Sequence, residues 1–148
     1  MTLTVEQLHI YTKDNPELNI LLEGNLQSSN ELVSLCMELC LSDFNSTPPV
    51  TEYNLDLFPN QSILLYGTLH HLCNSEAERQ LRNQVTFNAQ GVHAGIDDKS
   101  QLYMNLSQYY KQLFDSKVKE FKTYLNMEEA WGGLKSPYSA INPRQYRS

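Results

Sequence analysis

The sequence predicts a mainly α-helical chain: a small helical bundle with an inserted β-hairpin and an extended C-terminal arm. Segments with apolar residues at helical spacing follow residues that cap helix N-termini, and one of them, at residues 99–126, is much longer than the rest. Two short apolar runs around a Gly-containing turn predict the hairpin at about residues 84–96. We therefore expect one helical domain over residues 1–134 and an arm over residues 135–148.

The composition favours protein contacts over other classes of function. Of the 148 residues, 19% are charged, which is below the usual quarter, and nine are tyrosines. Residues 1–78 carry a net charge of −10 and residues 79–148 carry +4, so head-to-tail copies can match an acidic face with a basic one. The overall charge of −6 argues against sequence-specific nucleic-acid binding. We also expect no membrane span, because no run of 18 apolar residues is present.

The first expected element is a short helix that begins at Thr4 and ends before the first proline. Thr4 and Gln7 fit a capping box, and Leu3 and Leu8 occupy the positions of a hydrophobic staple. Residues 18–23 form an apolar run that is too short to classify by its period.

The second helix is expected over residues 30–43, after a capping signal at residues 28–31. The same residues also alternate at period two, so a strand is the rival interpretation, and the capping signal favours the helix. Two prolines at residues 48–49 end it, and residues 51–58 form an extended connection. The apolar stripe of this helix is expected to comprise Leu32, Leu35, Cys36, Leu39 and Cys40.

The third helix is expected to follow a cap at Asn60 and to end at about residue 77. Its apolar residues lie around most of its circumference, which is typical of a central helix. The fourth, over about residues 99–126, would span roughly 40 Å, so we expect part of it to face a neighbour. Its C-terminal half is expected to be basic, because it contains Lys117, Lys119 and Lys122.

The arm contains two prolines, three basic residues and no acidic residue. Its spaced aromatic and aliphatic residues predict docking on another surface, with a flexible terminus as the alternative. Trp131, just before the arm, is predicted either to cover the core or to anchor an interface. The predicted partner-binding residues are Trp131, Tyr138, Ile141, Pro143, Arg144, Tyr146 and Arg147.

The sequence contains no recognised catalytic motif, since GxSxG, HExxH, GxxxxGK[ST], GxGxxG and CxxC are all missing. We expect no catalytic residue, no cofactor and no metal. The alternative from another class is a small zinc-dependent enzyme, with Cys36 and Cys40 one helical turn apart and His70, His71 and Cys73 on the third helix. Ordinary burial of small apolar thiols explains the same cysteines, and we prefer it.

The order of the elements carries a family resemblance. A helix ends in DFNSTPP at residues 43–49, the core helix contains LLYG at residues 64–67, and the hairpin leads into a long Tyr-rich helix. In this order the chain resembles the neck proteins of tailed bacteriophages, the head-completion adaptors that dock as a ring beneath the portal. The resemblance covers roughly residues 30–134, and residues 1–29 lie outside it.

The resemblance implies a structural virion protein that is not an enzyme. It implies a homo-oligomeric ring of about twelve copies that connects portal and tail in the neck of the virion, assembled in the host cytoplasm. The implied partners are the portal protein and other neck or tail proteins. The alternatives within the same class are another assembly or scaffold protein and a tail-terminator protein.

Overall fold

The computed structural model describes residues 3–83, 88–89, 92–93 and 99–132. These residues form a mainly helical structure, which confirms the predicted fold class at that level. The elements in chain order are α1 (Val5–Thr12), the 3₁₀ helix η1 (Ile20–Leu22), α2 (Asn30–Ser46), α3 (Gln61–Arg82), β1 (Asn88–Ala89), β2 (Val92–His93) and α4 (Lys99–Gly132).

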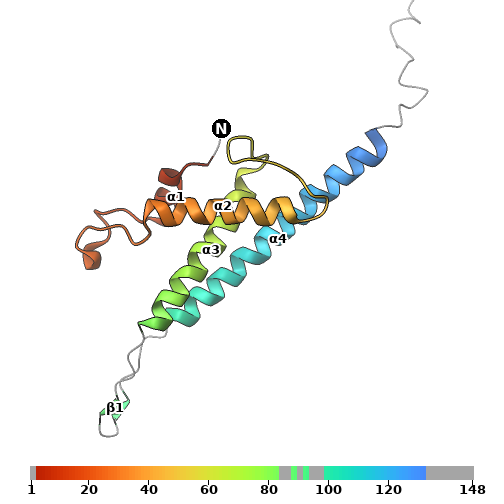
Figure 1. Cartoon of the computed structure of the whole chain (residues 1–148). Helices are drawn as coiled ribbons and strands as arrows, with labels where there is room; N and C mark the ends of the chain where they lie inside the picture. Colours follow the sequence, from red (N-terminus) through yellow and green to blue (C-terminus); the bar gives the residue numbers. More distant parts are fainter. Residues whose placement is uncertain (1–2, 84–87, 90–91, 94–98, 133–148) are drawn as a thin grey trace, which may run out of the picture.

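The two longest helices form the frame of the fold. α3 and α4 run side by side in opposite directions, and α2 crosses them, with α1 at the N-terminal end of α2 (Figure 1). α4 is 34 residues long, or roughly 50 Å, and extends six residues beyond its predicted end. Its C-terminal turns extend past α2 and α3 (Figure 1). None of the helices in the described part of the chain is long and apolar enough to cross a bilayer.

Side chains at the expected positions cap three of the helices. The Thr4 hydroxyl accepts a hydrogen bond from the backbone N–H of Gln7, and the Gln7 side chain accepts one from the N–H of Thr4, so the predicted capping box is present. Ser29 caps α2 and Asn60 caps α3 in the same way. α2 ends at Ser46, just before the two prolines, and α3 continues to Arg82, five residues beyond its predicted end.

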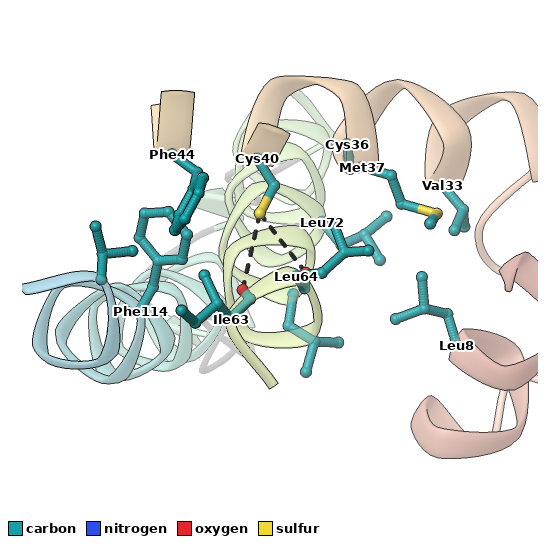
Figure 2. Packing of buried hydrophobic residues seen from close by; sticks show 12 residues of the cluster. Leu8, Val33, Cys36, Met37, Cys40, Phe44, Ile63, Leu64, Leu72 and Phe114 are labelled. Carbon is teal, nitrogen blue, oxygen red and sulfur yellow. Dashed lines mark hydrogen bonds between the residues drawn. The ribbon is translucent and has the colours of Figure 1, made fainter. Parts of the chain in front are cut away.

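The core lies where α2 meets α3 and α4, and α1 closes one side of it (Figure 2). Both residues of the predicted staple reach the core, because Leu8 is buried and Leu3 packs against the same cluster. α2 and α3 approach closely at Gly67, where an added Cβ would collide with the Cys40 sulfur. The buried cluster comprises Leu8, Val33, Cys36, Met37, Cys40, Phe44, Ile63, Leu64, Leu69, Leu72, Phe114 and Val118.

The predicted buried face of α2 is wrong for two of its five residues, and the helical state of α2 is confirmed. The helix is rotated relative to the predicted stripe, so Leu35 and Leu39 are 52% and 43% exposed. Cys36 and Cys40 are buried as predicted, and Leu32 packs against the core. Val33, Met37 and Phe44 face the core in place of the two leucines. The predicted and the observed sets share Cys36 and Cys40, and the close approach of α3 at Gly67 requires a small side chain such as Cys40 at that contact.

The structure describes only four residues of the predicted hairpin. β1 and β2 are two residues each and pair antiparallel, with Asn88 opposite His93 and Ala89 opposite Val92. A pairing of this length does not support a hairpin over residues 84–96, whose remaining residues lie outside the described parts of the chain.

Candidate functional site

The predicted partner-binding residues lie at and beyond the C-terminal end of α4. Trp131 belongs to the last turn of this helix. The other six, in the predicted arm, lie outside the described residues: Tyr138, Ile141, Pro143, Arg144, Tyr146 and Arg147. Their role therefore stays a prediction from the sequence.

The residues of the zinc alternative do not converge on one point. The Cys40 Sγ lies 3.8 Å from the carbonyl oxygen of Ile63 and 3.7 Å from that of Leu64 (Figure 2). The His71 Nε2 lies 3.1 Å from an Asp43 carboxylate oxygen, and the His70 Nδ1 lies 2.8 Å from the Ser107 hydroxyl. Within the described part of the chain, no three His, Cys, Asp or Glu side chains are placed to hold a metal ion.

The three thiols are poor nucleophiles in this structure. Burial raises the pKa of Cys36 to about 11 and, together with the nearby Glu76, that of Cys73 to about 11. Burial and the nearby Asp43 raise the pKa of Cys40 to about 12. Because the thiolate is the reactive form, all three thiols should react slowly at neutral pH. Cys36 and Cys40 belong to the core.

A buried polar cluster joins α1 to α2. The imidazole of His9 bridges two side chains: its Nε2 lies 2.9 Å from the Asn30 Oδ1, and its Nδ1 lies 3.4 Å from an Asp14 carboxylate oxygen. Both His9 and Asp14 are buried. The cluster fixes the position of the segment that joins these two helices.

The carboxylate of Asp14 binds the end of this connecting segment that lies just before α2. One oxygen accepts hydrogen bonds from the backbone N–H of Gln27 at 2.7 Å and the Asn19 amide at 2.6 Å, and the other accepts from the N–H of Ser28 at 2.9 Å. Burial alone would raise the pKa of Asp14, but these bonds and His9 outweigh it and hold the pKa below its ordinary value of 3.8.

A small cavity of about 230 Å³ lies beside this cluster, between α1, α3 and α4. Its wall includes His9, Asp14, Cys73 and Tyr103 together with several leucines. Among the described residues, every buried side-chain nitrogen and oxygen already has a hydrogen-bond partner. The cavity is smaller than usual ligand pockets.

The segment between α1 and α2, residues 15–28, presents aliphatic side chains to solvent, and we call it the apolar loop. Leu21 is 97% exposed, Ile20 83% and Leu18 60%. Leu22 and Leu26 are also exposed. Apolar side chains that gather in this way on a surface mark an interaction site more often than scattered ones do.

The apolar loop is held in shape by its own polar groups. The Asn19 amide donates to the Asn25 carbonyl oxygen at 3.0 Å as well as to Asp14, and the Asn25 amide donates to the Leu22 carbonyl oxygen at 2.9 Å. The backbone N–H of Gly24 donates to the Asn19 carbonyl oxygen. The polar side chains therefore satisfy the backbone while the aliphatic ones are left on the outside.

Sequence reasoning missed this loop as a candidate site. Residues 18–23 show no helical or strand period, so their aliphatic side chains have no predictable direction. The sequence does contain a usable signal. Residues that favour turns, Asn19, Gly24 and Asn25, are interspersed with five aliphatic residues in one short segment, which indicates aliphatic side chains on a turn.

Comparison with protein-family models, curated proteins and solved structures finds no match to this chain.

Proposed function

We propose that this chain is a structural virion protein of a tailed bacteriophage that forms a ring in the neck and connects portal and tail. It acts by binding to copies of itself and to neighbouring proteins, without catalysis. The portal protein and other neck or tail proteins are its partners, and assembly takes place in the host cytoplasm.

The observation that carries this proposal is the end of α4, which extends beyond the helices that cover the rest of it (Figure 1). Tyr124 and Met127 in this part are more than half exposed. A helix that buried its apolar residues only within its own chain would stop where its neighbours stop. α4 instead carries its last turn away from the bundle (Figure 1).

The charge distribution supports contact between copies. The acidic first half and the basic second half attract each other, and a ring of head-to-tail copies places these halves side by side. Such a contact is heterologous, and it closes into a ring of about twelve copies when the rotation between neighbours is about 30°.

In this proposal, the arm docks in a groove on the portal or on an adjacent copy. Tyr138, Ile141 and Tyr146 become buried, while Arg144 and Arg147 pair with acidic residues of the partner. Trp131 and Pro143 contact the same partner in this proposal. Ordering the arm only on docking makes assembly sequential.

The direct test is cosedimentation with the purified portal protein encoded in the same genome. We expect the intact chain to sediment with the portal ring and the chain shortened to residues 1–134 to stay in solution. A matched pair of full-length variants separates side-chain contacts from length: Tyr138→Ala with Tyr146→Ala should lose binding, whereas Ser139→Ala with Gln145→Ala should keep it. Equal binding by the intact and shortened chains would show that the arm is not the docking element.

The same experiment separates the other assembly roles. Binding to a tail-tube or scaffold protein but not to the portal would favour the tail-terminator or scaffold alternative.

A further inference from the structure

We propose that the apolar loop of one chain docks in a groove on α4 of a second copy, in a head-to-tail contact that repeats around the ring. The inference rests on the proposed ring and names the surfaces through which neighbouring copies touch. Both surfaces belong to the described residues.

The apolar loop is prepared for a partner of defined chemistry. Leu18, Ile20 and Leu21 are exposed on a loop whose backbone is already fixed by Asp14, so little ordering is required on docking. Glu17 and Glu23 flank these residues and have no partner for their carboxylates among the described residues. The loop therefore matches an apolar surface that also carries basic groups.

These carboxylates also count against two other occupants. Anionic lipid head groups repel Glu17 and Glu23, so a membrane surface is disfavoured. Two copies that met loop to loop would place the same carboxylates against each other, and like charges that face one another across an interface cost affinity.

A groove of about 320 Å³ on the C-terminal half of α4 offers the complementary surface. Phe121 and Tyr124 supply aromatic surface, and Lys117 supplies a positive charge that has no partner among the described residues. Asn60 and the acidic Glu120 complete the lining, so Lys117 is the one basic group of this groove among the described residues. Lys119, two residues along, lies on the other side of buried Val118 and lines a different pocket, so it does not belong to this groove.

The loop and the groove lie at opposite ends of α2. The loop end is fixed by the bond between His9 and Asn30, whereas at the other end the Phe44 ring lies 5.7 Å from that of Phe121. The 17 residues of α2 separate these ends by roughly 25 Å (Figure 1). A chain thus cannot fill its own groove with its own loop, and a second copy can, which is the geometry of a ring or filament.

Disulfide cross-linking between two differently tagged chains tests the contact. One chain carries Leu21→Cys and the other Tyr124→Cys. The unsubstituted chain, which contains only the three native cysteines, gives the background level of cross-linking. We expect a cross-linked heterodimer from this pair. The matched control replaces Tyr124→Cys by Leu81→Cys, which is 61% exposed at the far end of α3 and should give at least about tenfold less product.

A charge exchange adds an independent readout. Glu17→Lys with Glu23→Lys in the first chain should lower the cross-linking yield about tenfold, and Lys117→Glu in the second chain should restore part of it, whereas Lys119→Glu on the other side of α4 should not. Restoration is not expected from a general loss of folding, and circular dichroism of each variant checks its helix content.

Three outcomes would overturn the inference. Leu21→Cys could cross-link equally well to Leu81→Cys and to Tyr124→Cys, it could cross-link preferentially to a second Leu21→Cys chain, or the charge exchange could fail to restore the cross-linking yield. If copies assemble on the portal while Leu21→Cys and Tyr124→Cys stay unlinked there, the inference is wrong and the proposed function stands. If the cross-link forms specifically but the chain never binds the portal, the contact stands and the neck function fails.

Discussion

The ammonium group of Lys122 lies 4.4 Å from the centroid of the Phe44 ring, inside the molecule. It donates hydrogen bonds to the Pro49 carbonyl oxygen at 2.8 Å and to the Thr51 hydroxyl at 2.7 Å, and its residue is only 2% exposed. Burial lowers the pKa of Lys122. Of the three lysines expected to make this part of α4 basic, Lys122 is thus buried, and it holds the connection after α2 against α4.

Replacing Lys122 should destabilise the fold more than replacing the neighbouring exposed lysine. Lys122→Met keeps most of the aliphatic stem but leaves the Pro49 carbonyl without its donor, so we expect a loss of about 2–3 kcal/mol in the free energy of unfolding. Lys119→Met is the control and should change it by less than about 0.5 kcal/mol. Urea denaturation measures both, and equal midpoints would contradict a structural role for the Lys122 bonds.

Gly67→Ala should loosen the packing of α2 on α3. The added Cβ would collide with the Cys40 sulfur and lie 2.9 Å from the Phe114 ring, so we expect about 1–3 kcal/mol of destabilisation. Cys40→Ala in the same chain removes one of the two collisions and should recover part of the loss. Thermal unfolding of the single and double variants gives the coupling, and simple additivity would show that the two side chains do not compete for one space.

The Asp14 bonds should make stability depend on acid pH. Because its pKa is lower in the folded chain than the ordinary 3.8, its contribution is complete above pH 3.8 and is lost as the pH falls through the folded pKa. Asp14→Asn should lower the free energy of unfolding by about 1–3 kcal/mol at neutral pH, and the stability of this variant should depend less on pH in the acid range. Glu17→Gln removes an exposed carboxylate and should leave the loss of stability at acid pH unchanged, as measured by unfolding curves recorded at a series of pH values below and above 3.8.

The cysteines should be inert in the native chain. With pKa values of about 11 to 12, fewer than about one in a thousand of these thiols is ionised at pH 7. Ellman's reagent should therefore react far more slowly with native than with denatured chain, and elemental analysis should find no stoichiometric zinc. Rapid native labelling, or one zinc per chain, would return the enzyme alternative to consideration.

The caps were predictable because each is set by a few neighbouring residues. Thr4, Ser29 and Asn60 each stand before a helix, and the structure shows each accepting a hydrogen bond from that helix. Local chemistry of this kind does not depend on how the helices pack.

The packed faces were less predictable, because distant residues decide them. Leu35 and Leu39 fit a helical stripe beside Cys36 and Cys40 as well as Val33 and Met37 do, and only the packing against the other helices shows which pair is buried. The apolar loop was missed for the same reason: its shape depends on Asp14 reaching Gln27, 13 residues further along the chain.

The mass of the full chain, alone and with the portal ring, tests the central claim most directly. Mass photometry at rising ratios of chain to portal gives the number of copies bound. The account predicts a small species for the chain alone and, on the portal, a plateau that corresponds to a ring of about twelve copies. A portal mass that stays unchanged at every ratio, with the chain sedimenting separately, would contradict it.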